Sequence, residues 1–318
     1  MSGYPIDLKW LGLGKEGGRG TPTTPTRYIP IGQDSNFDYK LNLIEDAQVR
    51  GILANFPPYA GTKEGLAKIA AMDVTDRIIG ELLYSALGTV TVTNNGDGSY
   101  THTFKKDPAL IQMPSYTYTM YRGISTKQYN LGVTKAINFN QAVDGKLMCD
   151  ADILFQTEST PTLTFTPSFD TPAPLEFYQN TLKVGGAAVT YVKDWTLSID
   201  NGSIAQRTLN GSQDCRDIIT FAKILVTGGM NAFFESETER NNFIANTAQS
   251  LEFIVKGAAL GSHYRTLDII LPEIHYTAFP YGNLDGLFGA SVAFNAYYNA
   301  ASSKAIEIDL TNDVASYA

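Results

Sequence analysis

The stretch CDADILF at residues 149–155 alternates between apolar and acidic side chains, and this alternation decides the fold class. Successive side chains of an extended chain point to opposite faces, so the apolar residues share one face while Asp150 and Asp152 share the other. The stretch therefore predicts a strand with one buried and one solvated face. Aspartate disfavours strands, so two of them need a reason: a metal or catalytic pair, an ordinary solvated face, or a charged surface with a function.

The composition of the whole chain fits a strand-rich globular protein. Of its 318 residues, 43% are hydrophobic and 18% are charged, so the chain can bury a large core. The 18 Tyr and 16 Phe residues favour strands. A net charge of −8 argues against a protein that grips nucleic acid through its phosphates, although not against one that stays near DNA without holding it.

The cysteines and the apolar runs bear on the compartment. Cys149 and Cys215 lie in separate segments without a CxxC spacing, so we expect neither a disulfide framework nor a zinc site. The N-terminal sequence lacks the continuous apolar stretch of a signal peptide, and no run is long enough to span a bilayer. We expect a soluble protein made in a cytoplasm.

Turn-forming residues divide the chain into two strand-rich halves. Residues 1–27 are predicted to form a flexible N-terminal arm, because 11–27 is rich in Gly, Thr and Pro with little apolar periodicity. Residues 158–181, rich in Pro, Thr and Ser, are predicted to form a linker. The two β domains expected on either side are 28–157 and 182–318.

Each half is expected to carry one helix among its strands. Residues 75–87 carry an apolar stripe at helical spacing, with Thr75 as the cap and Gly88 as the stop. Ser236 and Glu239 fit a capping box at the start of the second helix. Residues 89–105 predict a hairpin, and further strands are expected at 28–33, 37–44, 65–72, 114–122, 128–140, 146–157, 182–200, 218–231, 249–256, 265–279, 287–298 and 304–311.

The two halves align with each other in sequence. LGVTKAIN at 131–138 matches FGASVAFN at 288–295, and the same offset carries CDADIL onto IEIDLT. Earlier segments match in the same order, which predicts an internal duplication. The acidic residues brought together are Asp150 with Glu307 and Asp152 with Asp309, and the earlier matches are 37–43 with 195–201 and 66–72 with 225–230.

No catalytic, metal or cofactor motif is convincing. The three histidines lie in separate strand-like segments, so solvated or hydrogen-bonded histidines explain them better than a metal site. GLGKEG at 12–17 matches G-x-G-x-x-G, but no strand precedes it and no helix follows. NNGDGS at 94–99 fits a hairpin turn and lacks the glutamate that ends a calcium loop. Neither a nucleophile elbow nor a P-loop occurs, so we expect no enzyme and no cofactor.

Five longer segments together carry a family pattern. They are GTPTTPTRYIPIGQDSNFDYKLNLIE (20–45), LAKIAAMDVTDRIIGELLYSALG (66–88), YTHTF (100–104), YRGISTKQYNLGVTKAINFNQAVDGKLMCDADILF (121–155) and VKDWTLSIDNGSIAQRTLNG (192–211). In this order they resemble the major tail tube proteins of long-tailed, non-contractile (siphovirus-type) bacteriophages. The resemblance runs from about residue 20 to 311 and lies in pattern and order rather than in an invariant motif.

This resemblance implies a mainly β fold with two tandem β-sandwich or barrel-forming domains of tail-tube type, each with one flanking helix. Inner sheets of neighbouring subunits would join into a closed barrel, which also removes exposed sheet edges. Rings would stack into a tube through which the genome is ejected. One-domain relatives form rings of six, so a two-domain chain would form trimeric rings with pseudo-sixfold symmetry. A contractile relative's inner tube is left open.

The resemblance also implies a location and partners. The protein would be a structural component of the virion tail, assembled in the host cytoplasm. Its partners would be further copies of itself, the tape measure protein, the tail terminator and the distal tail proteins. DNA would pass through the lumen without specific binding, and no membrane insertion is expected.

The acidic strands suit such a lumen for a physical reason. DNA carries about one charge per 1.7 Å of its axis, so a basic wall would hold it, while an acidic wall disfavours sticking within about 8 Å. Two alternatives are solvation on the tube exterior and a divalent ion held by the paired carboxylates, for which no third ligand is apparent. The candidate lumen-lining residues are Asp150, Asp152, Glu307 and Asp309.

Two segments carry candidate contacts between subunits or rings. The loop 45–63 is long, and loops of this length are usually functional or disordered, so Arg50, Phe56 and Tyr59 are expected contacts. Aromatic residues folded back onto their own domain are the alternative. The N-terminal arm is expected to order on assembly. Its candidate contacts are Trp10, Leu11 and Leu13.

Two other classes of function compete with a tail tube. One is a non-catalytic carbohydrate-binding protein with two β-sandwich domains, which would present Trp195, Tyr297 and Tyr298 to a glycan. The other is an enzyme of unrecognised type. Assembly into rings or tubes would distinguish the tail tube hypothesis from both of these alternatives.

Overall fold

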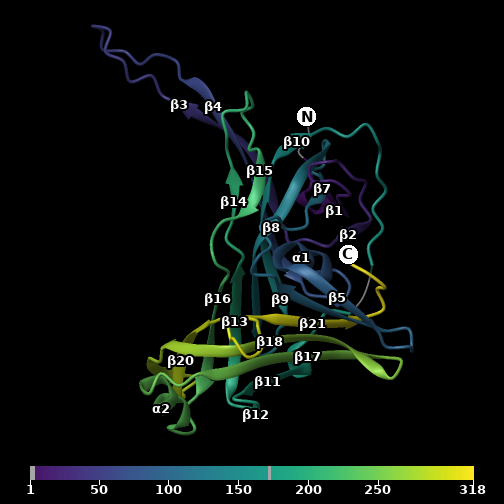
Figure 1. The fold of residues 1–318 in the computed structure, drawn as a ribbon, viewed down its shortest axis with the longest axis vertical. Coiled ribbons are helices and arrows are strands. Elements are labelled where there is room, and N and C mark those ends of the chain that lie inside the picture. Colours follow the sequence, from purple (N-terminus) through teal and green to yellow (C-terminus); the bar gives the residue numbers. More distant parts are fainter. Residues whose placement is uncertain (1–3, 171–172) are drawn as a thin grey trace.

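The computed structural model describes residues 4–170 and 173–318 and has the mainly β architecture expected from the sequence (Figure 1). Nineteen strands belong to one hydrogen-bonded network, and two more form a separate hairpin. The network contains three sheets that share long strands. Two short α-helices and two 3-10 turns, Ile6–Leu8 and Phe177–Gln179, complete the described fold.

The largest sheet, here called the long sheet, has eight antiparallel strands that come from both halves of the chain. In Figure 1, several of its strands follow the long axis of the molecule. Their spatial order is β3 (Asn36–Ile44), β4 (Tyr59–Asp73), β9 (Met148–Phe155), β8 (Thr126–Ala142), β13 (Val192–Asp200), β16 (Leu225–Phe233), β20 (Leu287–Ala296) and β18 (His263–Ala278).

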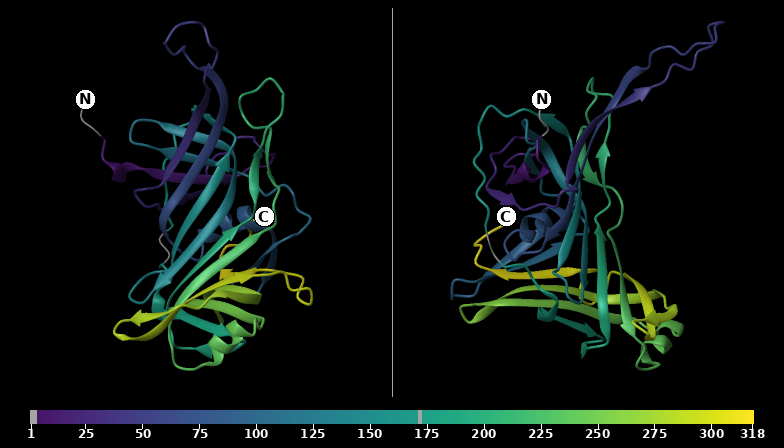
Figure 2. Two further views of the ribbon diagram at one scale, coloured as in Figure 1. Left: turned by 90° about the vertical axis from the view of Figure 1, so that its left-hand side faces the viewer. Right: turned by 180° about the vertical axis from the view of Figure 1, so that it is seen from behind.

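A second sheet, here called the cross sheet, runs across the first (Figures 1 and 2). It includes β18, whose N-terminal part pairs with β17 and β21 while its C-terminal part pairs with β20 in the long sheet. The order is β12 (Ala187–Val189), β11 (Asn180–Val184), β17 (Gln249–Leu260), β18, β21 (Glu307–Asn312), β6 (Tyr100–Lys106) and β5 (Gly88–Asn94).

A third, small sheet surrounds the N-terminal part of β8. The order is β2 (Arg27–Ile29), β1 (Trp10–Lys15), β7 (Tyr116–Tyr121), β8 and β10 (Thr157–Ser159). Two hairpins complete the pairing: β19 (Tyr281–Leu284) pairs with β20 within the network, and β14 (Ser203–Gln206) pairs with β15 (Asp217–Thr220) outside it.

The core lies between the long sheet and the layers that cover it. Burial alternates along β9 as the sequence predicts, with Cys149, Ala151 and Ile153 at most 1% exposed. Trp195 of β13 lies over Phe253 of β17, with ring centroids 4.2 Å apart, so the cross sheet packs directly on the long sheet. Residues on the facing sides of the two sheets belong to one continuous hydrophobic cluster.

The first helix ends at Gly88 as expected, but neither helix has the cap that the sequence predicts. Helix α1 (Ile79–Leu87) packs on β8 and ends at Gly88, whose φ of 90° is the left-handed conformation that glycine adopts readily. Thr75 does not cap it, because the turn before the helix is held by ion pairs of Asp76 and Arg77. Helix α2 (Thr238–Ile244) lacks the expected capping box, because Glu239 accepts a hydrogen bond from Tyr276 instead.

The prediction of an unpacked N-terminal arm is wrong for residues 10–15. These residues form β1, in which Leu11 and Leu13 are at most 1% exposed. The glycines that suggested a linker let the following segment approach closely: a Cβ at Gly12 would lie 2.8 Å from Cβ of Pro25. The predicted arm also includes residues 1–3, which lie outside the described residues.

Strand pairs connect the two halves of the chain. β8 pairs with β13, and β6 pairs with β21, so the halves share both large sheets. The division into domains at 28–157 and 182–318 therefore stays a prediction, as does the linker 158–181, which includes the undescribed residues 171–172. The predicted stretch 182–200 contains three strands rather than one, because the chain turns at Gly185 and Gly186.

The pairing pattern of the second half repeats that of the first. In the strand pairs compared below, β18 takes the place of β8, β20 takes the place of β9, and β21 takes the place of β10. The pairs β1–β2, β1–β7, β7–β8, β8–β9, β4–β9, β3–β4 and β8–β10 recur in order as β11–β12, β11–β17, β17–β18, β18–β20, β16–β20, β13–β16 and β18–β21.

This pattern corrects the alignment made from sequence. The ungapped offset matched β9, the strand of Asp150, with β21, the strand of Glu307. In the pairing pattern, however, the counterpart of β9 is β20, and β21 is the counterpart of β10. The second half carries the additional hairpin strand β19 between β18 and β20, and a gap is needed to pass it. The earlier matches, of β3 with β13 and of β4 with β16, agree with the pairing pattern.

Candidate functional site

The outer face of the long sheet is a broad polar surface. It points away from the core and carries two shallow grooves of about 410 and 420 Å³. Short polar side chains dominate it, mixed with a few charges of both signs. Its residues include Asp38, Lys68, Lys135, Asn138, Asn140, Asp152, Thr196, Ser198, Asp200, Thr227 and Asn295.

Asp150 and Asp152 both lie on this face, as the alternation predicts. Asp150 has a local structural task, because its Oδ1 accepts a 2.7 Å hydrogen bond from the backbone N–H of Ala71. Ala71 sits in a bulge of β4 with a φ of 47°, where the backbone leaves the regular ladder. Lys68 lies 3.4 Å from the other carboxylate oxygen of Asp150 and directly opposite Asp152 in register.

Glu307 and Asp309 lie on a different surface, the outer side of the cross sheet. Burial alone would raise the pKa of Glu307, but hydrogen bonds from Lys105 and Lys304, each 2.5 Å, lower it below its ordinary value. Asp309 accepts a 2.6 Å hydrogen bond from Thr103, and burial raises its pKa. The structure therefore does not bring the four predicted acidic residues together within one subunit.

Sequence reasoning missed the acidic partner of Asp309. Asp268 of β18 lies opposite Asp309 in register. Burial and the nearby carboxylates of Glu252 and Asp309 raise its pKa to about 7. The sequence feature that could have revealed Asp268 is the alternation in TLDIIL, which places this residue on the outer side of its strand.

The predicted contact residues of the loop 45–63 lie on a projecting hairpin. The β3–β4 hairpin leaves the body of the molecule and extends beyond every other element (Figures 1 and 2). Within it, the Arg50 guanidinium lies 4.1 Å from the Phe56 ring centroid and 2.7 Å from the Asp46 carboxylate. Tyr59 is 60% exposed. The other exposed apolar residues of this hairpin are Leu41, Leu43, Ile44, Val49, Ile52 and Leu53.

The predicted contact residues of the N-terminal segment lie against their own subunit. Leu11 and Leu13 are core residues, so the expectation that they are available to a neighbour is wrong. Trp10 stacks on Tyr121 at 6.0 Å between ring centroids and meets Tyr28 edge-on at 5.5 Å. These contacts place β1 within the small sheet of the isolated subunit.

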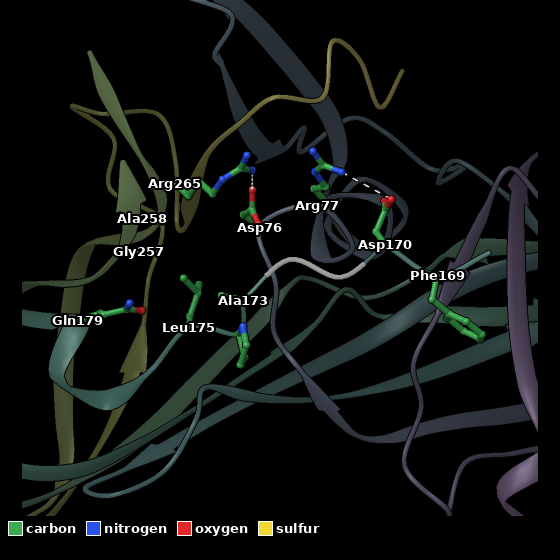
Figure 3. A pocket seen from close by; sticks show the side chains of 11 residues that line it. Asp76, Arg77, Phe169, Asp170, Ala173, Leu175, Gln179, Gly257, Ala258 and Arg265 are labelled. Carbon is green, nitrogen blue, oxygen red and sulfur yellow. Dashed lines mark hydrogen bonds and ion pairs between the residues drawn. The ribbon is translucent and has the colours of Figure 1, made fainter. Parts of the chain in front are cut away.

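A charged cavity of about 570 Å³ lies where the two halves meet (Figure 3). Arg265 of β18 bonds to Asp76, which is 2% exposed, and donates a 2.9 Å hydrogen bond to Asp313 near the C-terminus. Arg77 donates to Asp313 as well and lies 3.6 Å from Asp170. Burial raises the pKa of Asp76, whereas the two arginines hold that of Asp313 well below its usual range. These pairs tie the halves together.

Reactive chemistry finds little support in the described residues. Cys149 and Cys215 are free and buried, and burial raises the pKa of Cys215 to about 11, so neither presents a thiolate. Within residues 4–170 and 173–318, no group of three or more His, Cys, Asp or Glu side chains is placed to hold a metal ion. None of the helices in that part of the chain is long and apolar enough to cross a membrane.

The aromatic residues expected of a glycan-binding protein do not form a common platform. Trp195 is 3% exposed and packs on Phe253, so it cannot stack on a sugar. Tyr297 and Tyr298 are 46% and 55% exposed and directly follow β20. The ring of Trp195 is therefore not available to a glycan, which removes one of the three aromatic residues on which the carbohydrate-binding alternative was based.

Comparison with known proteins gives a match over most of the chain. A family model described as "Phage tail tube protein" matches residues 11–296. A search of curated proteins found no match.

Proposed function

Because the chain belongs to the phage tail tube protein family, we propose that it assembles into stacked rings that form the conduit for DNA in a phage tail. It is a structural protein of the virion tail and not an enzyme. The observation that carries the ring proposal is the pair of edge strands of the long sheet, β3 and the C-terminal part of β18. Their counterparts in the other half, β13 and the C-terminal part of β8, pair with each other within the chain. We further propose a non-contractile tail, in which the tube meets the tape measure, terminator and distal tail proteins.

The free edges of the long sheet suggest how a ring closes. Within residues 4–170 and 173–318, β3 forms a strand pair only with β4, and residues His275–Ala278 of β18 form one only with β20. The counterparts of these edges, β13 and the C-terminal part of β8, pair with each other inside the chain. We therefore expect β3 of one copy to pair with the end of β18 in the next, as β13 pairs with β8. Such pairing would leave the long sheet without an open edge in the ring.

The repeated pairing pattern supports an internal duplication and a ring of three. Each half supplies four strands to the long sheet, so each chain supplies eight. Three chains of eight strands would close a barrel of 24 strands (3 × 8). The halves would then alternate around the ring with pseudo-sixfold symmetry.

We propose that the polar face of the long sheet lines the channel. Asp38, Asp152 and Asp200 lie there beside two lysines, among neutral Asn, Thr and Ser side chains. A wall of this kind offers DNA no continuous set of cations to bind, so the phosphates would slide past. Asp150 belongs to this face, but Glu307 and Asp309 belong to the cross sheet, and we propose no channel role for them.

Ring formation is tested directly by microscopy and mass. Purified protein at rising concentration should give rings or tubes in negative-stain electron micrographs, and native mass spectrometry should show three chains in the smallest closed species. A persistent monomer at every concentration would overturn the tail tube proposal for this chain.

The channel wall is tested by charge reversal. Asp38→Lys/Asp152→Lys changes two carboxylates of the polar face for which no hydrogen bond or ion pair holds the side chain within the described chain. We expect tubes to assemble but genome ejection to slow several-fold, because the wall would attract phosphates. The control, Asp107→Lys/Glu235→Lys, makes the same charge change at exposed positions away from this face. Equal ejection rates for both variants would contradict the channel assignment.

A further inference from the structure

A further cavity, of about 270 Å³, is lined by residues of both large sheets. The long sheet contributes Gln141 of β8 and Trp195 of β13, and the cross sheet contributes Asn180 and Leu182 of β11. Strands β11 and β12 lie at the lower end of the view in Figure 1. The residues of this cavity take no part in the pairing between copies or in the channel wall proposed above.

Three polar atoms at this cavity have no hydrogen-bond partner within residues 4–170 and 173–318. They are Nε2 of Gln141, Nε1 of Trp195 and Oδ1 of Asn180. Gln141 and Trp195 are each 3% exposed, and they lie directly opposite each other in the register of β8 and β13. Buried polar atoms are normally paired, because losing water without a replacement is costly, so a cluster of three calls for a partner from outside the chain.

The two amide side chains already form part of a hydrogen-bonded ring. Nδ2 of Asn180 donates a 2.6 Å hydrogen bond to Oε1 of Gln141. This bond uses one group of each amide and leaves an N–H donor on Gln141 and a carbonyl acceptor on Asn180. A third amide has the complementary groups, and its carbonyl oxygen has a second lone pair for the indole N–H of Trp195. One ligand group would therefore satisfy all three unpaired atoms.

The geometry of the pair favours a primary amide over a peptide bond. Because Gln141 and Asn180 are joined by a hydrogen bond, their two unpaired atoms face a ligand from the same side. A primary amide carries an N–H on the same side as its carbonyl oxygen, so one edge offers both a donor and an acceptor. A trans peptide bond holds its N–H and its carbonyl oxygen on opposite sides.

The remaining walls favour an uncharged ligand. Among the described lining residues, Lys193 is the one that carries a charge, and both carboxylate oxygens of Asp285 hold its ammonium group, at 2.6 and 2.7 Å. A charged ligand would therefore find no free counter-charge in the cavity. The other walls are mainly apolar, formed by Val143, Phe177, Leu182, Val189 and Val192.

The volume of the cavity exceeds that of a bridging water. One water molecule takes up about 30 Å³, so a single water would leave most of the cavity empty. The cavity is slightly smaller than the roughly 300–1,000 Å³ of pockets for drug-sized ligands. Apolar walls with a few placed polar groups are typical of binding sites for small molecules or single side chains.

We propose that this cavity binds a primary amide group, whose carbonyl oxygen accepts hydrogen bonds from Gln141 and Trp195 and whose N–H donates to Asn180. The same group occurs in small free carboxamides and in the Asn or Gln side chain of another protein chain. The site lies within one subunit, so it stands or falls independently of ring assembly.

The indole N–H of Trp195 provides a direct test by nuclear magnetic resonance. The chain has two tryptophans, so Trp10→Phe assigns the two indole signals. When acetamide is added to the ¹⁵N-labelled full chain, the Trp195 signal should shift in a saturable manner and the Trp10 signal should not. Methyl acetate has the carbonyl but no N–H, and we expect it to bind about ten-fold more weakly, because Asn180 would stay unpaired.

Two further probes define the ligand. N-methylacetamide, which has the geometry of a peptide bond, should also bind more weakly than acetamide. The blocked amino acid N-acetylglutamine methylamide distinguishes the two sources. Binding tighter than that of acetamide would assign the site to a side chain of another protein, whereas exclusion of this larger probe would assign it to a small free carboxamide.

A matched pair of variants tests the role of the amide of Gln141. Gln141→Met should abolish the saturable shift with acetamide. The control Gln128→Met makes the same change in the same strand, at a residue that is 8% exposed and whose amide bonds to Thr119 instead, and it should bind acetamide as the wild type does. Equal binding by the two variants would overturn the assignment. If Gln141→Met does not fold, the comparison of acetamide with methyl acetate on the wild-type chain still decides.

The remaining outcomes also decide the proposal. A Trp195 signal that does not move with acetamide would mean that the three polar atoms bind water only, and it would overturn the site. Equal affinity for acetamide and methyl acetate, or tighter binding of N-methylacetamide, would overturn the assignment to a primary amide. None of these results bears on tube formation, which is measured separately by microscopy and mass.

Discussion

At the scale of single residues, Asp150 explains why a strand of this sheet tolerates an aspartate. Its carboxylate accepts the backbone N–H of the bulged residue Ala71, which has no partner in the ladder. The neighbouring Asp152 makes no such bond in the described chain. Two aspartates that look equivalent in the sequence therefore differ in the structure: Asp150 holds the bulge of β4, whereas no hydrogen bond holds Asp152 within the described residues.

This difference predicts unequal effects on stability. Asp150→Ala should lower the free energy of unfolding by about 1 kcal/mol, because the hydrogen bond to Ala71 is lost. Asp152→Ala should change it by less than about 0.5 kcal/mol, as is usual for a surface substitution. Urea unfolding of the monomer measures both, and equal losses would contradict the task assigned to Asp150.

Asp268 predicts a pH dependence of opposite sign to ordinary carboxylates. Its pKa is raised to about 7 by burial beside Glu252 and Asp309, with Glu307 adding to the rise and Lys183 opposing it. A carboxyl with a higher pKa in the folded state binds its proton more tightly there, so this contribution to stability is present at low pH and is lost as pH rises through about 7.

Replacement with asparagine should remove this pH dependence. Between pH 5 and pH 8, the wild-type free energy of unfolding should fall relative to that of Asp268→Asn by on the order of 2 kcal/mol, since each unit of pKa difference is worth about 1.4 kcal/mol and the carboxyl is partly exposed. Parallel curves for the two proteins across this range would show that Asp268 titrates normally.

At the scale of elements, the end of α1 depends on one glycine. Gly88 has a φ of 90°, and a Cβ there would also collide with the side chain of Leu110. Gly88→Ala should therefore lower the free energy of unfolding by about 2–3 kcal/mol. The matched control is Gly96→Ala, at a φ of 82° with open space around it, which should cost about 1 kcal/mol. Equal costs in urea unfolding would show that the crowding at Leu110 is relieved without penalty.

The sequence predicts most of the elements because their alternation and turns are local. The β5–β6 hairpin and the alternation of β9 needed no knowledge of other segments. β1 was missed because glycines at 12 and 14 resemble a linker, although they serve close packing. The passage of β8 and β18 from one sheet to another depends on bulges and partners far away in the chain, which local patterns do not contain.

The candidate surfaces were predictable to a similar extent. The polar side of β9 and the exposed β3–β4 hairpin follow from alternation and loop length. The position of Glu307 and Asp309 does not, because an ungapped alignment cannot recognise that β21 is the counterpart of β10. Short strands with similar alternation match one another at several offsets, and only their pairing partners distinguish them.

At the scale of the whole molecule, the two halves are joined by shared sheets and by buried charges. Arg265 from the second half neutralises Asp76 from the first, which is 2% exposed. Arg265→Met should lower the free energy of unfolding by about 3 kcal/mol, because it leaves a buried carboxylate without its partner. Asp76→Asn/Arg265→Met should recover part of that loss. A double variant that is less stable than the single one would contradict this account of the pair.

The same arrangement relates the subunit to the tube. A chain whose halves pair through β8 and β13 already contains one junction of the proposed ring, and its free edges offer the other. Assembly would therefore extend a contact that the chain makes with itself. A high-resolution electron cryomicroscopy reconstruction of the assembled tube tests this claim most directly. We expect three chains per ring, β3 of each chain paired with the end of β18 of the next, and Asp152 facing the channel. Six chains per ring, or a long sheet whose polar face lies on the outside of the tube, would contradict the account.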